Sequence, residues 1–175
     1  MMHNVRIPVS RPDELRSDAK ELLPLIAPPG REPARTMAVL ARQPDLLSPF
    51  LGWAAALALS GVLPQRDHEL LALRVASNCG SEFEWVQHVE YARAAGLADD
   101  EITMVARSIE EGRWSDAERA LLRLADELHD GCDVTDATWA ILVEHYDEPA
   151  LVEKLFVVGQ YTMLSMVANA AGIPA

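Results

Sequence analysis

The sequence predicts an all-α protein, and three observations lead to this prediction. No stretch of useful length alternates apolar and polar residues with the period of two that a half-buried strand requires. Helix start signals recur along the chain, and glycine or proline follows most of the apolar stretches as a stop signal. Of the 175 residues, 50% are apolar and 24% are charged, which is typical of a globular protein with one helical core.

Proline and glycine delimit the first three helices. Pro33 stands in the first turn of the second helix, where its missing N–H costs nothing. Some thirty residues cannot close a core alone. We therefore expect residues 1–32 to form a helical arm and residues 33–175 to form a single helical domain. The three helices are expected at 12 or 13–26, 33–42 and 44–58.

The later helices begin at capping residues and end at glycine or proline. Pro64 starts a helix that Gly80 terminates. Ser81, followed three residues later by Glu84, matches a capping box, in which each side chain accepts the backbone N–H of the other residue. Eight or nine helices are expected in all. Further N-caps are expected at Asp99, Ser115 and Thr135, and the later helices at 64–79, 81–95, 99–110, 115–131, 135–146 and 149–171.

The formal net charge of −12 argues against several kinds of partner. Contacts to phosphate need clustered Lys and Arg, so we expect neither nucleic acid nor an anionic membrane surface as a partner. Residues 155–171 are mostly apolar but carry polar interruptions, and they are expected to form a buried helix rather than a membrane span. The N-terminus lacks the apolar segment of a signal peptide.

The two cysteines, Cys79 and Cys132, are far apart in the sequence. This usage fits a reducing compartment, and it excludes a zinc knuckle or an intact Cys-x-x-Cys redox pair. We therefore expect a cytoplasmic protein.

The segment from Glu69 to His88 carries the residues best suited to proton transfer. Glu84 and His88 are four residues apart, so on a helix they lie on the same face, and Tyr91 extends that face by a turn. Glu69 stands among leucines, which places it near the core, where a carboxylate needs a partner. A carboxylate and an imidazole in this arrangement indicate general acid–base chemistry.

These residues resemble the carboxymuconolactone decarboxylase and alkylhydroperoxidase D superfamily. The resemblance is strongest over residues 64–105, which include Ser81-Glu-Phe-Glu84-Trp-x-x-His88, and residues 151–170 are similar to the longer members. It implies that the domain is an alkylhydroperoxidase D-like helical bundle that acts on a small-molecule substrate. It also implies homo-oligomers, as trimers or as dimers and hexamers.

In the hydroperoxidase branch of this superfamily the motif is a Glu, eleven residues, a Cys, two residues, a Cys, three residues and a His. The Glu corresponds to Glu69 and the His to His88, but Ser81 and Glu84 stand where the two cysteines belong. A dithiol peroxidase needs one thiolate to attack the peroxide and a second to resolve the sulfenic acid. Neither a hydroxyl nor a carboxylate does this, and Cys79 is the only sulfur nearby.

The decarboxylase branch implies acid–base catalysis with neither a metal nor an organic cofactor. When its substrate loses CO₂, the protein must stabilise an enolate and deliver a proton to carbon. His88 would deliver the proton, Glu69 would orient the imidazole, and Glu84 would serve as a second acid or base. We therefore predict a cofactor-free lyase or isomerase that acts on a small carboxylated or lactone-like molecule.

Two other functions stay open at this point. A thiol-dependent hydroperoxide reductase, with peroxiredoxin-type activity, would use Cys79 alone and an external thiol. A non-catalytic helical oligomer would keep the motif only for capping and packing. A metal site made of Glu69, Glu84 and His88 lacks the Glu-x-x-His spacing of di-metal helical bundles and is not expected.

Each candidate residue also has a structural explanation. The capping box accounts for Ser81 and Glu84, and an ion pair with Arg66 or Arg74 would account for Glu69. Burial as a small apolar residue would account for Cys79. Ser81, Trp85 and Tyr91 are the candidate pocket residues, Phe83, Tyr161, Met163 and Met166 are expected in a core or an interface, and His68 is expected to face solvent.

Overall fold

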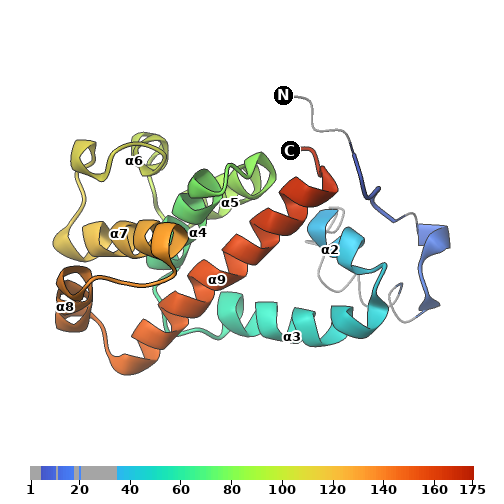
Figure 1. Ribbon diagram of the computed structural model, residues 1–175, viewed down its shortest axis with the longest axis horizontal. Helices are drawn as coiled ribbons and strands as arrows, with labels where there is room; N and C mark the ends of the chain where they lie inside the picture. Colours follow the sequence, from blue (N-terminus) through green and yellow to red (C-terminus); the bar gives the residue numbers. More distant parts are fainter. Residues whose placement is uncertain (1–4, 11, 18–19, 21–34) are drawn as a thin grey trace. The chain divides into compact units, whose positions relative to one another are not determined.

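The computed structural model describes residues 5–10, 12–17, 20 and 35–175. These residues form eight α-helices and two short 3₁₀ helices and contain no strand, which confirms the all-α prediction (Figure 1). The chain divides into two compact units. One contains the described residues up to Gly61 together with Val167–Pro174, and the other is Val62–Met166. The limits of these units differ from the expected division after residue 32.

The first unit contains α2 (Arg35–Leu40), α3 (Pro44–Leu59) and the end of α9. The helix expected at 12–26 falls largely outside the described residues, and its first residues form the 3₁₀ helix η1 (Pro12–Glu14). The helix expected at 33–42 is shorter than predicted, since it ends at Leu40. The small core of the first unit consists of Ala41 and Leu47, with Leu15, Met37, Leu40 and Leu51 packed around them.

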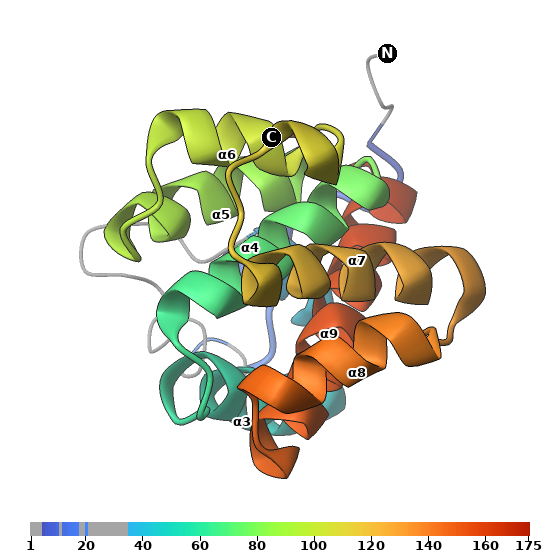
Figure 2. The ribbon, with the colours of Figure 1, turned by 90° about the vertical axis from the view of Figure 1, so that its left-hand side faces the viewer.

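The second unit is built around α4 (Gln65–Asn78). Three helices pack against it, namely α5 (Glu82–Ala94), α6 (Asp99–Val105) and α7 (Asp116–Gly131), and α7 in turn packs against α8 (Asp136–His145) (Figure 2). Burial of the apolar faces of these helices drives their association. The core between them consists of Leu70, Leu73, Ala92, Leu97, Ile102, Val105, Trp114 and Leu122.

The turn between α4 and α5 determines which groups reach the candidate site. Gly80 has φ of +58°, and the N–H of Ser81 donates to the carbonyl of Ala76 at 2.9 Å, as in a Schellman motif. The Ser81 N–H is therefore already satisfied. Consequently only half of the expected capping box forms: Ser81 Oγ accepts the N–H of Glu84 at 3.5 Å, while the Glu84 carboxylate does not return to Ser81.

The other expected capping box is complete. Ser115 Oγ accepts the N–H of Glu118 at 3.2 Å, and the Glu118 carboxylate accepts the N–H of Ser115 at 2.9 Å. The preceding residue, Trp114, follows a loop rather than a Schellman turn, so the N–H of Ser115 is available to Glu118. The same sequence pattern thus gives different structures at positions 81 and 115.

The prediction of a single helix over residues 99–110 is wrong, because the helix is shorter. Ala98 rather than Asp99 is its N-cap, α6 ends at Val105, and a separate 3₁₀ helix, η2 (Ile109–Glu111), follows. The guanidinium of Arg74 donates to the carbonyls of Val105 and Arg107 at 2.6 and 2.7 Å. These bonds satisfy carbonyls at the end of α6, which a longer helix would use internally.

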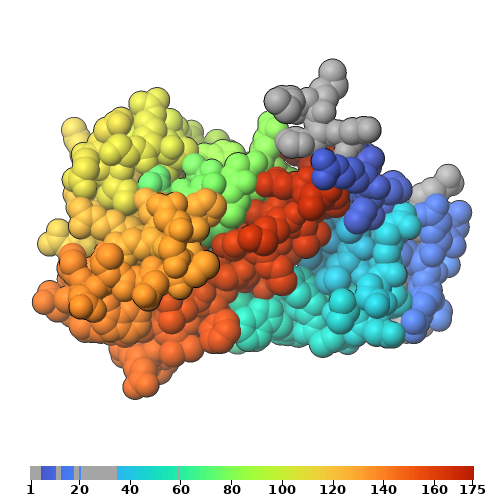
Figure 3. All heavy atoms as spheres, viewed as in Figure 1, coloured from blue at the N-terminus to red at the C-terminus, as the bar shows by residue number. Residues whose placement is uncertain are grey.

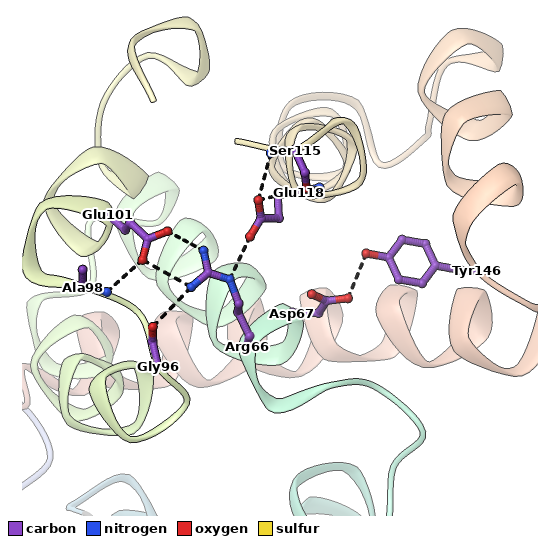
Figure 4. A network of polar contacts seen from close by, with 8 residues as sticks. All are labelled: Arg66, Asp67, Gly96, Ala98, Glu101, Ser115, Glu118 and Tyr146. Atoms are coloured by element: carbon purple, nitrogen blue, oxygen red, sulfur yellow. Dashed lines mark hydrogen bonds and ion pairs between the residues drawn. The ribbon is translucent and has the colours of Figure 1, made fainter. Parts of the chain in front are cut away.

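Two arginines on α4 hold it against its neighbours. Arg66 donates to Glu101 of α6 and, at 2.8 Å, to Glu118 of α7 (Figure 4). Arg74 makes two parallel bonds of 2.6 Å to Asp126 of α7. Bidentate pairs of this kind fix orientation as well as distance. They therefore give α4 a defined position from which its other side chains reach the site.

The last helix, α9 (Glu148–Ala171), is long and apolar enough to cross a membrane by length and composition alone, a test that core helices of water-soluble proteins also pass. The expectation of a buried helix is correct for one face only. That face carries Leu151, Val157 and Tyr161, all less than a tenth exposed. On the opposite face, atoms of α9 lie uncovered at the surface (Figure 3).

Candidate active site

The centre of the candidate site is a hydrogen bond between α4 and α5. His88 Nδ1 lies 2.7 Å from Glu69 Oε2, and the two residues are 7% and 4% exposed. At this distance Nδ1–H donates to the carboxylate, which fixes the tautomer and the orientation of the ring. The other ring nitrogen, Nε2, is then left for proton transfer, as in catalytic carboxylate–histidine pairs.

Glu84 faces this free nitrogen. Its Oε2 lies 3.8 Å from His88 Nε2, which is too long for a direct hydrogen bond. Its Oε1 is buried and has no hydrogen-bond partner among the residues that the structure describes, which is rare for a buried carboxyl oxygen. Burial raises the pKa of Glu84, and the nearby His88 lowers it only in part. Glu84 is thus a carboxyl group that holds its proton more readily than usual, one helical turn from an imidazole.

Two further residues, His68 and Tyr161, complete the cluster. His68 Nε2 and the hydroxyl of Tyr161 form a hydrogen bond of 2.8 Å, and the Tyr161 ring meets the His88 ring edge to face with centroids 4.4 Å apart. Burial lowers the pKa of His68 and raises that of Tyr161, so both are neutral at neutral pH. Tyr161 therefore joins α9 to both histidines.

His68 and Tyr161 were not recognised as site residues from the sequence. His68 was expected to face solvent, but it is only 3% exposed, so that expectation is wrong. It lies one residue before Glu69 on α4, and Tyr161 approaches it from a helix more than ninety residues further along the chain. The only signal in the sequence was a tyrosine on the buried face of α9, which does not by itself identify a partner.

The expected arginine partners of Glu69 are bound elsewhere. Arg66 and Arg74 pair with carboxylates on α6 and α7, as described above. Among the described residues, neither Glu69 nor Glu84 forms an ion pair with Lys or Arg, and the imidazole of His88 lies beside both carboxyl groups. An ion pair with Arg66 or Arg74 therefore does not account for Glu69. The partner of the Glu69 carboxylate is His88, the candidate catalytic histidine.

The three expected pocket residues differ in their surroundings. Ser81 is 1% exposed and acts as the N-cap of α5. Trp85 is partly buried and packs against the core of the second unit. Tyr91 is 51% exposed, and its ring centroid lies 5.6 Å from that of His88. Of the three, Tyr91 is the one that connects the cluster to the surface.

Cys79 lies in a different environment from the Glu69–His88 pair. Its Sγ is 3.8 Å from His129 Nδ1, and burial raises the pKa of its thiol. A raised pKa lowers the fraction of thiolate, which is the reactive form. Cys132 is exposed, in the left-handed conformation that ends α7.

A second cluster of buried or partly buried polar side chains, made of Asp67, Tyr146 and Lys154, includes the residue next to His68. The hydroxyl of Tyr146 donates to Asp67 at 2.8 Å (Figure 4), and Lys154 Nζ lies 3.2 Å from the centre of the Tyr146 ring. Lys154 is fully buried, and burial lowers its pKa to about 8. In the part of the chain that the structure describes, no group of three or more His, Cys, Asp or Glu residues is arranged to hold a metal ion.

Residues 44–127, which include both α4 and α5, match the carboxymuconolactone decarboxylase family, and this match confirms the resemblance seen in the sequence. No curated protein sequence is similar to this chain.

Three solved structures share the fold. A peroxidase-related protein with the alkylhydroperoxidase AhpD core, from Ralstonia eutropha JMP134, is 20% identical, with a TM-score of 0.81 over 96% of this chain and 90% of its own. A peroxidase-related protein from Silicibacter sp. TM1040 is 17% identical, with a TM-score of 0.80 over 94% and 87%. A protein of unknown function from Agrobacterium tumefaciens, linked by name to AhpD and antioxidant defence, is 20% identical, with a TM-score of 0.71 over 77% and 93%. At these identities the similarity establishes the fold alone.

Proposed function

From the premise that residues 44–127 belong to the carboxymuconolactone decarboxylase family, we propose that the protein is a cofactor-free lyase or isomerase. Its substrate is a small carboxylated or lactone-like molecule, and proton transfer takes place at His88 Nε2. The observation that carries this proposal is the position of His88, whose Nδ1 is bound to Glu69 at 2.7 Å while its Nε2 faces Glu84 at 3.8 Å.

The 3.8 Å gap suits a reacting atom. An atom of the substrate placed beside the gap can lie about 2.8 Å from both His88 Nε2 and Glu84 Oε2, which is the reach of general acid–base catalysis. Glu84 Oε1 is buried and has no partner in the described part of the chain, so it is a second polar atom that a bound molecule would satisfy. The three side chains therefore offer a proton donor, its orienting carboxylate and an additional acid.

In the decarboxylation, the bond between the carboxylate carbon and its neighbour breaks, and CO₂ leaves. The electron pair passes into the conjugated carbonyl, which becomes an enolate. Protonated Glu84 donates a hydrogen bond to the enolate oxygen, and His88 transfers its Nε2 proton to carbon. An isomerisation uses the same groups, except that His88 first removes the proton that it later returns. Glu69 stabilises the imidazolium in both reactions.

The surroundings of the pair favour a substrate with little negative charge at the reacting end. Within the described residues no Lys or Arg is paired with Glu69 or Glu84, so a dianionic substrate would meet two carboxyl groups whose charge the His88 imidazolium alone would have to offset. A lactone, or a monoacid whose carboxylate points away from the pair, avoids this repulsion. We therefore place lactone-like molecules ahead of dicarboxylates in the substrate class.

The experiment that tests this proposal follows proton transfer directly. Unsaturated lactones and keto acids are incubated with the protein in D₂O, and deuterium incorporation and CO₂ loss are followed by NMR. We expect turnover by the wild type, a loss of about 10²–10⁴-fold in His88→Gln, and no change in Cys79→Ala. Equal turnover by His88→Gln and the wild type would contradict the proposal.

A peroxide assay distinguishes the proposed lyase or isomerase from the main alternative, a peroxidase that uses Cys79. Hydroperoxide consumption with a dithiol reductant is compared between the wild type, Cys79→Ala and His88→Gln. We expect consumption no faster than the uncatalysed rate in all three, because the pKa of Cys79 is raised and the two motif thiols are replaced. Consumption that depends on Cys79 would instead identify a one-cysteine peroxidase.

A further inference from the structure

Tyr161 is the residue through which α9 reaches the candidate site, and it lies outside residues 44–127, the segment that matches the family. Its ring meets the His88 ring edge to face at a centroid distance of 4.4 Å and the His68 ring at 5.5 Å. Its hydroxyl forms a hydrogen bond of 2.8 Å with His68 Nε2. All three residues are less than a tenth exposed. The proton transfer proposed at His88 uses neither Tyr161 nor His68.

The pair formed by Tyr161 and His68 is unsuited to proton transfer. Burial raises the pKa of Tyr161 well above its usual value, and the charges of Glu69 and Glu84 raise it further. Burial lowers the pKa of His68. A proton passed from the Tyr161 hydroxyl to His68 would leave two opposite charges in a buried place, and burial opposes the charged form of both residues. The pair therefore stays neutral, and it acts on the site by its position rather than by a proton that it delivers.

The bond to Glu69 sets which edge of the His88 ring faces the carboxylate, but a single bond tolerates small rotations of the ring. The torsion that turns a histidine ring has broad preferences, and an oxygen acceptor takes hydrogen bonds over a wide range of directions. A turn of about 30° around Nδ1 would move Nε2 by about 1 Å, and a misplacement of that size costs on the order of 10²-fold in rate. Proton transfer at Nε2 therefore needs a second restraint on the ring.

Tyr161 is better placed than Tyr91 to supply this restraint. The Tyr91 ring also meets His88, but its centroid is 5.6 Å away and the residue is 51% exposed. The Tyr161 centroid is 4.4 Å away, at the short end of the range for aromatic pairs. The Tyr161 hydroxyl is bound to His68, the residue before Glu69 on α4, so the ring is anchored at one end. A buried and anchored ring leaves the imidazole little room to turn.

From these contacts we propose that Tyr161 is a positioning residue of the active site, an inference whose meaning for catalysis rests on the proton transfer proposed at His88. The Tyr161 ring holds the plane of the imidazole so that Nε2 stays directed at Glu84. Two consecutive residues of α4 thus restrain His88, Glu69 by a direct bond and His68 through Tyr161. The site therefore extends beyond the segment that matches the family and includes one side chain of α9.

The first test observes the His88 ring by NMR without any substrate. The Nδ1 proton lies in a buried bond to Glu69, so we expect a far-downfield resonance that exchanges slowly with water and is absent in His88→Gln. Tyr161→Leu removes the aromatic ring and should speed this exchange about tenfold. Tyr161→Phe keeps the ring but loses its bond to His68, so its exchange rate should lie between those of the wild type and Tyr161→Leu.

Tyr146 provides the matched control for these variants. Its hydroxyl also forms a bond of 2.8 Å to α4, at Asp67, which is the residue before His68. In the part of the chain that the structure describes, its ring makes no contact with the ring of His88. Tyr146→Leu and Tyr146→Phe should therefore leave the exchange rate of the His88 proton at its wild-type value. Equal acceleration by Tyr161→Leu and Tyr146→Leu, or no acceleration by Tyr161→Leu, would overturn the proposal.

The second test uses the unsaturated lactones of the D₂O assay as the probe. Tyr161→Leu should lower kcat by about 10²-fold with little change in KM, because the ring positions the proton donor and does not bind the substrate. A higher KM with unchanged kcat would contradict the positioning role. If the wild type shows no turnover while the NMR exchange rates are as expected, the proposed function fails, but the restraint of His88 by Tyr161 is upheld.

Discussion

A double-mutant cycle on Glu69 and His88 tests whether the two side chains act as a coupled pair. The substitutions are Glu69→Gln, His88→Gln and both together, which keep the size of each side chain close to the original while removing its charge or its ring. If the two residues are only neighbours in a packed core, their effects on the free energy of unfolding add. If they form a charge-assisted hydrogen bond, the effects do not add.

The structure sets the expected size of the coupling. Both residues are less than a tenth exposed, and the bond between His88 Nδ1 and Glu69 Oε2 is 2.7 Å long. A hydrogen bond to a charged group contributes about 1.5–3 kcal/mol, and solvent screens a buried pair less than an exposed one. We therefore expect a coupling free energy of about 2 kcal/mol at pH 7.

The assay is urea unfolding followed by circular dichroism at 222 nm. The control cycle uses Arg123 and Glu110, which are bonded at 3.1 Å with side chains 41% and 67% exposed. An exposed pair of this kind contributes about 0–1 kcal/mol, and added salt should weaken it further. A Glu69–His88 coupling no larger than that of the control pair would refute the interpretation of this bond as a charge-assisted pair.

Three further predictions use the same unfolding measurement. Tyr161→Phe should lower stability by about 1–3 kcal/mol, because it leaves the buried His68 Nε2 without its partner; an unchanged midpoint would contradict this. Burial lowers the pKa of Lys154 from 10.5 to about 8, so between these values the unfolded chain holds a proton that the folded chain has lost. Stability relative to Lys154→Met should therefore rise by about 1.4 kcal/mol per pH unit in this window, and a fall would reverse the assigned sign. Ser115→Ala should cost about 1 kcal/mol and Ser81→Ala less, because the Ser81 cap bond is longer; equal losses would show that the two caps are equivalent.

The helices of the second unit could largely be predicted from the sequence. Pro64, Gly80, Gly96 and Thr135 mark their starts and stops through local backbone preferences, and the structure has its helix boundaries there. The local sequence signals did not predict the end of α6, because the helix stops at Val105 and not at residue 110. The reason is that Arg74, distant in sequence, donates to carbonyls that a longer helix would have used.

The candidate site was predictable only in part. The spacing of Glu84 and His88 placed them on one face of a helix, and the distance from Glu69 matched a family motif. The sequence could not distinguish a capping role for Glu84 from a site role, because both use the same Ser-x-x-Glu pattern. In the structure, the Schellman turn at Gly80 binds the N–H of Ser81 to the carbonyl of Ala76, so the Glu84 carboxylate does not cap the helix and faces His88 instead.

The sequence by itself determined the helical class, the caps of most helices and the Glu69–His88 spacing, since these depend on neighbours within one or two helical turns. The tertiary structure alone decided that His68 is buried, that Tyr161 of α9 binds it, and that Glu69 pairs with His88 instead of an arginine. These contacts join residues from nineteen to more than ninety positions apart. Their partners depend on how α4, α5 and α9 pack, and no local preference of the chain encodes that arrangement.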